Sequence, residues 1–552
     1  MVNMNQKRNF ILTYLPWLWL IAGAVIMLIY QIGPGKALVD GDMGGEMILA
    51  DLLNKEGDFL LSDNWYYATE IHVFFLQIIY RPLLLIFPNN WHIVRVISAM
   101  LIYGINTLGY LLMMKELGVK KPAVWGAGTL LWPMGMWRLF LGLYGTQYLV
   151  YDFFMFYILW LIFYICNING KSLKRILAIV FLAALSLIGG INGVRETMML
   201  FAPIGVGAVV LVVVRFFTCQ KNVASFKECF DALKSEIKLL IIIVCAAFIN
   251  LVGYAFNVLV LLRRYSFQSN TKMLWKEKLS FTDIIDAIAD YFSLFGFTGE
   301  VKLLSIDGLC SMVGVLVAFV LIVIVVRLCN RHSSLSMNEQ FILYTFIGGL
   351  LMCSIIFGML QEMNEPRFWL PFLPFGIMLF EIEGDTEDWK FPGMKTLAGV
   401  LLSLMIVVTS VGALKGELER PHEGKMKSID MSQYLATNGY TQGYTQYWLA
   451  NTIQEQTNGR VQARPLMYYE TFEMMPWSNR IDYTTTYPEG EVFLVLDKKS
   501  YPGDVHDSYA IQYADVTVIF EDDDWIVLLA PRAEELEKAY ELALTNSLID
   551  SQ

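Results

Sequence analysis

Residues 10–30 have the sequence FILTYLPWLWLIAGAVIMLIY, and residues 40–46, shortly after them, have the sequence DGDMGGE. The first stretch carries no charged side chain and is long enough to cross a bilayer, which takes about 20 apolar residues. Lys7 and Arg8 precede it and no convincing cleavage site follows it, so we expect a retained membrane span rather than a removed signal peptide. The second stretch crowds three carboxylates and three glycines close to the end of that span.

The composition of the whole chain is that of a membrane protein. Its 552 residues are 56% hydrophobic and only 17% charged, whereas soluble domains carry about 25% charged residues. No basic stripe accompanies the net charge of −10, which argues against a nucleic-acid partner. The seven cysteines and five histidines show no zinc-like spacing, and neither a zinc site nor a disulfide framework is expected.

Eleven segments are apolar and long enough to be membrane spans. Lysines and arginines cluster at every second connection between them, which places those connections in the cytoplasm. The N-terminus is then cytoplasmic, and the odd number of spans puts the C-terminus outside. We therefore predict a polytopic α-helical bundle in the plasma membrane, with spans near 10–30, 92–114, 122–143, 146–166, 175–191, 197–217, 238–262, 308–328, 339–360, 367–381 and 396–414.

The segment 71–87 is a further apolar stretch, with Arg81 and Pro82 in its middle. If it crossed the membrane, the basic connection at 115–121 would move outside and the alternation of basic connections would fail. We therefore expect a helix that lies at, or dips into, the outer surface.

Two external loops are long, at 31–91 and 263–307. The first contains a predicted helix at 43–54 with an apolar stripe, and then Trp65-Tyr66-Tyr67, which is typical of a membrane-interface belt. The second contains a predicted surface helix at 281–297. The second loop, which also carries Lys272, Lys276 and Lys278, is a candidate lid.

The tail, residues 415–552, has a different sequence pattern from the membrane domain at 1–414. Strand-like runs at 492–496, 516–520 and 525–529 alternate with helical stretches near 443–457 and 533–545, which predicts a small extracytoplasmic α/β domain. The aromatic residues of 443–448 would suit sugar binding, but we expect them to pack the core of this domain.

The acids of the first loop, Asp40, Asp42 and Glu46, are the main candidates for chemistry. Carboxylates at the membrane surface can act as a general base or hold a divalent cation, with Asp40 and Asp42 as the ligands if a metal takes part. The glycines between them would let a substrate approach the backbone. Alternatively, Asp42 only caps a helix starting at Met43, and the other two acids are solvated.

Arginines at the outer ends of spans form the second group of candidates, because they run against the positive-inside preference. An arginine grips a phosphate through paired donors, and a lipid phosphate is the obvious anion there. Alternatively, these side chains reach out to lipid headgroups, and Arg195 pairs with Glu196. The candidate phosphate ligands are Arg138, Arg195 and Arg367; the other outer arginines are Arg81, Arg263 and Arg264.

This layout resembles the membrane glycosyltransferases of the GT-C fold, and is most similar to bacterial relatives of the protein mannosyltransferases and of the aminoarabinose transferase that modifies lipid A. In that group an acid early in the first external loop is catalytic; Asp40 or Asp42 matches it by position, and Glu46 is a further candidate. Members often open a late span with an Arg-aromatic pair and prolines, as Arg367-Phe368 does here. The paired Asp-Glu of many members is spread out in this chain, which leaves open which acid acts.

The resemblance implies an enzyme that moves a sugar, with inversion, from a polyprenyl phosphate to an extracytoplasmic glycan, lipid or protein acceptor. One first-loop acid would deprotonate the acceptor hydroxyl, and Arg367, with Arg138 or Arg195, would stabilise the departing phosphate. A divalent cation is permitted but not required. Two other functions stay open: a polytopic transporter or lipid flippase, and a non-catalytic membrane-anchored surface protein.

For the transferase, the candidate residues that contact the acceptor are Trp65, Tyr66 and Glu70.

Overall fold

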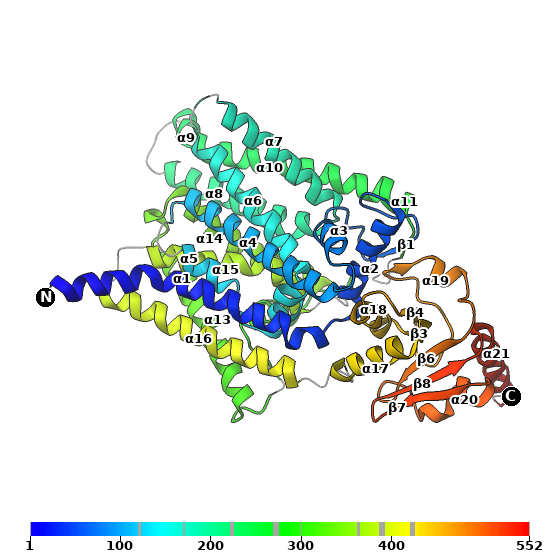
Figure 1. The fold of residues 1–552 in the computed structure, drawn as a ribbon. Helices are drawn as coiled ribbons and strands as arrows, with labels where there is room; N and C mark the ends of the chain where they lie inside the picture. Colours follow the sequence, from blue (N-terminus) through cyan, green and yellow to red (C-terminus); the bar gives the residue numbers. More distant parts are fainter. Residues whose placement is uncertain are drawn as a thin grey trace. The chain divides into compact units, whose positions relative to one another are not determined.

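The computed structural model describes residues 2–119, 123–168, 170, 172–220, 226–268, 275–299, 301–360, 365–385, 392–419 and 425–550, and most of them are helical (Figure 1). The chain forms two compact units. Unit 1 contains Met1–Ile29, Ala99–Val260 and Lys272–Glu419; unit 2 contains Tyr30–Ser98, Leu261–Thr271 and Arg420–Gln552. The tail from Arg420 thus shares a unit with the whole first loop at 31–91, and the predicted domain boundary at 414/415 stays a prediction.

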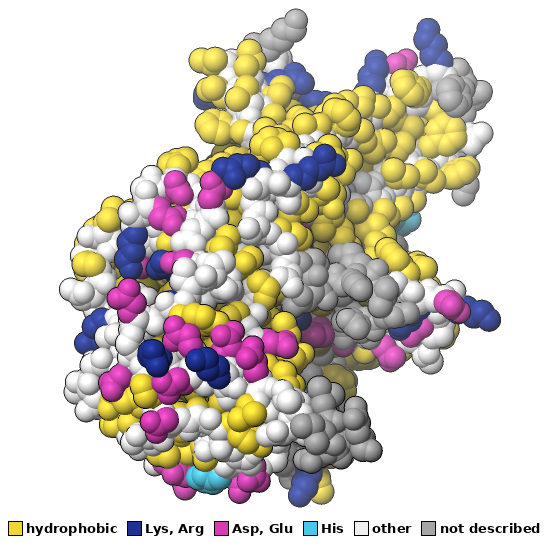
Figure 2. All heavy atoms as spheres, turned by 90° about the vertical axis from the view of Figure 1, so that its right-hand side faces the viewer, with side chains coloured by type: hydrophobic (Ala, Val, Ile, Leu, Met, Phe, Trp, Pro, Cys, Tyr) yellow, Lys and Arg dark blue, Asp and Glu magenta, His cyan; other side chains and the backbone are white. Residues whose placement is uncertain are grey.

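Nine helices in the described part of the chain are long and apolar enough to cross a membrane, which confirms the predicted polytopic bundle. Many of their leucine, isoleucine, valine and phenylalanine side chains are exposed, as expected where lipid is the solvent, and hydrophobic side chains cover wide areas in Figure 2. The helices that form these spans are α1 (Val2–Ile32), α4 (Trp91–Leu117), α6 (Gln147–Asn167), α7 (Leu173–Ile191), α8 (Ala202–Gln220), α10 (Lys234–Phe256), α13 (Ile306–Asn330), α14 (Met337–Met359) and α16 (Pro392–Glu419).

Two of the eleven predicted spans are interrupted instead of continuous. The segment 122–143 contains α5 (Ala123–Thr129), an irregular stretch around Pro133, and the π-helix η2 (Arg138–Tyr144). The segment 367–381 begins in the 3-10 helix η6 (Pro366–Phe372) and continues as α15 (Leu373–Asp385). Prolines cause such breaks, because they lack the N–H that an α-helix needs and clash with the preceding turn. Both segments lie among the apolar helices of unit 1, so their freed backbone groups are covered by protein.

The segment 71–87 contains only the short helix α3 (Gln77–Ile86). A helix of 10 residues is about 15 Å long, which is half the thickness of the hydrocarbon core. This agrees with the expectation that the segment does not cross. Arg81 of α3 donates from Nε to Asn54 Oδ1 at 3.0 Å, which ties α3 to the preceding helix.

The first α-helix that lies wholly in unit 2 is α2 (Gly41–Glu56), which matches the helix predicted at 43–54 closely, and its predicted apolar stripe is buried. The following strand β1 (Trp65–Ala68) pairs in parallel with β2 (Phe267–Gln268) and antiparallel with β5 (Asn479–Arg480). Trp65 and Tyr67 are buried in this unit. The prediction of an interface belt is therefore wrong for these two side chains, because both are buried inside the protein instead of facing a membrane surface.

The tail folds into an α/β domain with a five-stranded sheet in the order β4-β3-β6-β8-β7. One face is covered by α17 (Lys425–Asn438) and α18 (Tyr447–Gln456), and the other by α20 (Tyr509–Tyr513) and α21 (Ala533–Asp550), as Figure 1 shows. The strands are β3 (Gln442–Gln446), β4 (Gln462–Leu466), β6 (Val492–Asp497), β7 (Thr517–Glu521) and β8 (Trp525–Ala530).

The three predicted strands of the tail match β6, β7 and β8, whereas the helix predicted from 443 begins only at Tyr447. Residues before it form β3, which pairs in parallel with both β4 and β6. A Cβ on Gly443 would lie 2.3 Å from the Phe493 ring, so only glycine fits there without rearrangement. The remaining short elements are η1 (Pro34–Ala37), η3 (Thr197–Phe201), α9 (Phe226–Ala232), η4 (Asn257–Leu261), α11 (Leu262–Arg264), α12 (Phe281–Ser293), η5 (His332–Ser334), α19 (Asp482–Thr485) and η7 (Val505–Asp507).

Candidate functional site

Asp40 caps the N-terminus of α2. Its backbone is extended, and its Oδ1 accepts a hydrogen bond from the Met43 N–H at 2.8 Å. This is the usual geometry of an aspartate that satisfies a free N–H in the first turn. The alternative that gave the cap to Asp42 is wrong, because the helix begins at Gly41, two residues earlier than expected.

Asp42 points to the tail of the chain. The Tyr447 hydroxyl donates to Asp42 Oδ1 at 2.7 Å. Tyr447 is buried at the start of α18, and burial, together with the charge of Asp42, raises its pKa well above the usual value. The phenol therefore keeps its proton and acts as a donor. This bond joins the acidic motif of the first loop to the aromatic motif of the tail.

The glycines of the acidic motif let α2 approach α18. A Cβ on Gly44 would lie 2.6 Å from the backbone oxygen of Asn451, and one on Gly41 would lie 3.0 Å from the Trp448 Cα. Asn451 also donates from Nδ2 to the Gly41 carbonyl at 3.0 Å. The expectation that these glycines open the backbone to a substrate is wrong for Gly41 and Gly44, because α18 fills that space.

Glu46 lies one helical turn after Asp42, on the same face of α2, and part of its side chain reaches solvent. Burial raises the pKa of its carboxyl from 4.5 to about 7. The charges of His72 and Arg95 act against this rise, and the charge of Asp42 adds to it. A carboxyl with a pKa near neutrality can accept a proton from a substrate and release it again.

Two ion pairs lie near these acids, His72 with Glu70 and Arg95 with Glu455. His72 Nε2 lies 3.4 Å from Glu70 Oε2, and both side chains are partly buried. Arg95 forms a buried two-pronged ion pair with Glu455, with N···O distances of 2.6 and 2.7 Å. Arg95 also donates to the Met43 carbonyl at 3.0 Å, so it fixes the first turn of α2 to α18.

The predicted acceptor contacts differ in their surroundings. Glu70 lies beside His72, near the acids of α2. The Tyr66 hydroxyl is 3.1 Å from Thr484 Oγ1, and its side chain is partly exposed. Trp65 is buried, so its ring presents little surface to a ligand.

The predicted metal ligands, Asp40 and Asp42, each accept a hydrogen bond from a protein donor. Within the described residues there is no group of three or more His, Cys, Asp or Glu side chains that could hold a metal ion. Metal binding by Asp40 and Asp42 stays a prediction.

The predicted phosphate ligands all lie in unit 1, on segments that contact one another. η6, which contains Arg367, contacts both η2, which contains Arg138, and η3, which follows Arg195 closely. η2 and η3 are π-helical, a conformation that is rare in general and frequent at functional sites. These segments are therefore neighbours in unit 1, although they lie far apart along the chain, and the binding of phosphate by their arginines stays a prediction.

The three arginines differ in what they can still bind. Arg138 and Asp152 form an ion pair at 3.1 Å and each side chain is only 1% exposed, so this guanidinium is already neutralised. Arg195 lies over the rings of Tyr148 and Tyr151, at 5.5 Å from each centroid. Arg367 forms an ion pair with Glu365 Oε2 at 2.6 Å, but its side chain is 37% exposed, so it is far more accessible than Arg138.

The second loop adds acids to this part of unit 1. Its helix α12 packs against η6, and it begins with a capping box of Ser280 and Asp283. The pKa of Asp290 on α12 is raised to about 6 by burial, and further by the charges of Asp286 and Glu365. Lys276 donates to Asp283 at 2.8 Å, while Lys272, the first of the predicted lid lysines, lies outside the described residues.

Comparison with known proteins links this architecture to one fold. No protein-family model and no curated protein sequence matches the chain. Among solved structures it is similar to ArnT from Cupriavidus metallidurans bound to undecaprenyl phosphate, with a TM-score of 0.52 and 11% identity over 93% of this chain and 97% of that chain.

Two further solved structures are similar. The apo state of the same ArnT has a TM-score of 0.49 and 10% identity, over 93% of this chain and 97% of that one. The Archaeoglobus fulgidus oligosaccharyltransferase tethered to an acceptor peptide has a TM-score of 0.47 and 12% identity, over 89% of this chain and 70% of that one. The near full-length likeness to undecaprenyl phosphate-bound ArnT confirms the predicted architecture: the chain has the GT-C fold.

Proposed function

We propose that this protein transfers a single sugar, with inversion, from a polyprenyl phosphate to an extracytoplasmic acceptor. The observation that carries the proposal is the carboxyl of Glu46, which has a pKa near 7 and lies one turn from Asp42 on α2. The likeness of the fold to ArnT, whose structure contains undecaprenyl phosphate, supports a polyprenyl-phosphate donor.

Glu46 is the acid best suited to act as general base. Asp40 is engaged as a helix cap, and Asp42 accepts the Tyr447 hydroxyl. In the proposed step, Glu46 takes the proton of the acceptor hydroxyl as its oxygen bonds to the anomeric carbon. The bond from that carbon to the phosphate oxygen breaks, and polyprenyl phosphate leaves with the electron pair. A single displacement of this kind inverts the anomeric centre, and base assistance typically contributes about 10²–10⁴-fold.

Arg367 and Arg195 are the proposed ligands of the departing phosphate. Arg367 is accessible, and both belong to segments that meet at η6. Guanidinium groups offer paired donors to phosphate oxygens, and fixed positive charge stabilises the negative charge that builds on the leaving group. Arg138 is a weaker candidate than the sequence suggested, because its guanidinium is buried and already forms an ion pair with Asp152.

The proposed orientation follows from the basic connections between spans. The N-terminus lies in the cytoplasm, and α2 and the tail lie on the outer side of the plasma membrane. The enzyme would then use a donor whose sugar faces outward and act on a glycan, lipid or protein of the cell envelope.

The test is transfer activity of the protein in lipid nanodiscs, with a radiolabelled polyprenyl-phosphate sugar, after Asp40→Asn, Asp42→Asn and Glu46→Gln are made singly. We expect Glu46→Gln to lose at least about 100-fold in kcat. Asp51→Asn is the matched control. Asp51 lies on the same helix, and its Oδ2 forms an ion pair with Lys55 Nζ at 2.6 Å. Full activity in all three variants would end this mechanism.

A lipid flippase is the second candidate. The interrupted helices at η2 and η6, together with the buried Arg138–Asp152 pair, are features that transporters often show. A flippase would move a fluorescent polyprenyl phosphate across vesicle membranes without consuming it. A transferase instead converts the donor sugar and need not move polyprenyl phosphate across the membrane.

A further inference from the structure

The α/β domain of the tail has a crevice where open α/β sheets usually bind ligands. Strands β4, β3 and β6 run parallel, with β3 in the middle. The chain leaves β3 through α18 towards β4, whereas after β6 it goes on to β7 and β8 on the opposite side. Loops that diverge in this way leave a crevice at the carboxyl ends of the two strands, and ligands of such sheets bind there.

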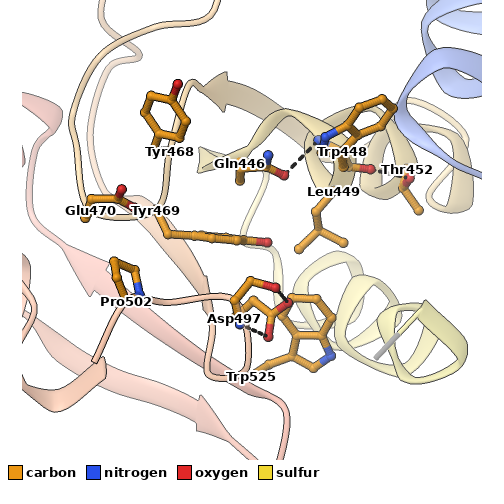
Figure 3. A pocket seen from close by; sticks show the side chains of 11 residues that line it. Gln446, Trp448, Leu449, Thr452, Tyr468, Tyr469, Glu470, Asp497, Pro502 and Trp525 are labelled. Atoms are coloured by element: carbon orange, nitrogen blue, oxygen red, sulfur yellow. Dashed lines mark hydrogen bonds between the residues drawn. The ribbon is translucent and has the colours of Figure 1, made fainter. Parts of the chain in front are cut away.

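A pocket of about 410 Å³ lies at this point (Figure 3). A pocket of this size falls within the range of small-molecule sites, roughly 300–1,000 Å³. It is lined by residues that end or follow all three parallel strands. The principal ones are Gln446 and Trp448 after β3, Tyr468, Tyr469 and Glu470 after β4, and Asp497 at the end of β6.

Aromatic side chains form much of the wall. Trp448 is 49% exposed and Tyr468 is 54% exposed, although both are large apolar rings. In Figure 3 the Tyr469 ring lies between Tyr468 and Asp497 and extends into the pocket. Tyr444 and Tyr447 of the same aromatic motif are buried, as the sequence predicted, but Trp448 is not part of the core. An exposed tryptophan and tyrosine at one crevice suit the apolar face of a sugar ring.

The polar groups of the pocket suit hydroxyls and do not suit anions. Gln446 Oε1 accepts from the Trp448 N–H at 3.1 Å, and its Nε2 makes no hydrogen bond to any other described residue. Asp497 is held in place by the Lys499 N–H and the Ser500 hydroxyl, each at 2.8 Å. The described lining includes the acid Glu470 but no lysine, arginine or histidine. A phosphate or a uronic acid would find no positive charge there.

We propose that this pocket binds a neutral pyranose unit of a glycan. The rings of Trp448 and Tyr468 pack against the faces of the sugar, and Gln446 and Glu470 bond to its hydroxyls. None of the residues that line the pocket belongs to α2, and binding there needs no polyprenyl-phosphate donor. The binding therefore stands or falls independently of the proposed transfer reaction.

The experiment uses the full chain in phosphatidylcholine nanodiscs, free of glycoside detergents, which would compete for the pocket. Saturation-transfer NMR and tryptophan fluorescence are recorded with glucose, galactose, mannose and N-acetylglucosamine and their disaccharides, and with inorganic phosphate and glucuronate. We expect saturable binding of at least one neutral saccharide. Trp448→Ala and Tyr468→Ala should each weaken it about tenfold or more, since each removes a stacking surface.

Tyr513→Ala is the matched control, because Tyr513 is 39% exposed in the same domain but does not line the pocket. It should leave the affinity unchanged. Tyr468 is on the surface, so its variant should fold even where Trp448→Ala does not. The proposal is overturned if no neutral saccharide binds, if Tyr468→Ala binds as tightly as the wild type, or if phosphate or glucuronate binds better than every neutral sugar.

Discussion

Replacing Glu46 with glutamine should change how the stability of unit 2 depends on pH. Burial raises the pKa of this carboxyl from 4.5 to about 7. Between these two values the unfolded chain releases the proton while the folded protein keeps it, so the wild type loses stability as pH rises through this window. Below and above this pH window, the contribution of Glu46 to the free energy of unfolding does not change with pH. Glutamine keeps the shape of the side chain and stays neutral, so the variant lacks this loss.

The size of the effect follows from the same pKa. Each unit corresponds to about 1.4 kcal/mol, so a rise from 4.5 to about 7 makes the ionised form about 3 kcal/mol less favourable in the folded protein than in the unfolded chain. Part of the side chain faces solvent, which makes this an upper value. For a cooperative unit of roughly 200 residues, each kcal/mol shifts Tm by about 2–4 °C. Glu46→Gln should therefore melt up to about 10 °C above the wild type at pH 8.

The assay is thermal unfolding in nanodiscs across a pH series from about 4.5 to 8, with the difference in Tm between variant and wild type as the readout. The difference should be near zero at the acidic end, grow up to about pH 7 and then stay level. Asp51→Asn should show no such trend. A Tm difference that is constant over the series, or that shrinks as pH rises, would refute the assignment of a raised pKa to Glu46.

Three further predictions follow from the contacts of unit 2. The kcat/KM for transfer should rise about tenfold per pH unit below about pH 7 and level off above it, because Glu46 acts in its ionised form. Initial rates of transfer measured at a series of buffered pH values test this. Tyr447→Phe removes the 2.7 Å bond to Asp42 and should cost about 1.5–3 kcal/mol, seen as a lower midpoint of denaturant unfolding. Arg95→Met leaves Glu455 buried without its partner and should cost about 3–5 kcal/mol, whereas Arg95→Met with Glu455→Leu should recover most of that loss; Tm measures both.

The membrane architecture could be predicted because it depends on local composition. An apolar run such as 10–30 needs no partner to be recognised, and nine such runs form long helices among the residues that the structure describes. The interruptions near Pro133 and Pro366 were less predictable, because average hydropathy over a window does not register the loss of a backbone donor. Where protein covers the freed groups, the chain tolerates the break.

The tail shows the same division between local and non-local signals. Val492–Asp497 has a strong strand pattern of its own and was predicted. Gln442–Gln446 became a strand only because β4 and β6 pair with it on both sides, and no local pattern contains that information.

The acids of the first loop stood out by their density, but their roles could not be assigned from spacing. A shift of two residues in the start of α2 gave the cap to Asp40 and left Asp42 to accept the Tyr447 hydroxyl. Arg95, Glu455 and His72 were missed because each is unremarkable in its own segment. Arg95 and Glu455 gain a role only from the approach of α18 to α2, and His72 only from its position near Glu46; both depend on contacts between distant parts of the chain.

The most direct test of the central claim is whether the purified protein consumes a polyprenyl-phosphate sugar. A panel of radiolabelled donors is incubated with the protein in nanodiscs and with cell-envelope extract as acceptor, and free polyprenyl phosphate is measured. We expect at least one donor to be converted by the wild type and not by Glu46→Gln. If every donor in the panel remains intact while the same protein moves polyprenyl phosphate across vesicle membranes, the chain is a flippase with the GT-C fold and not a transferase.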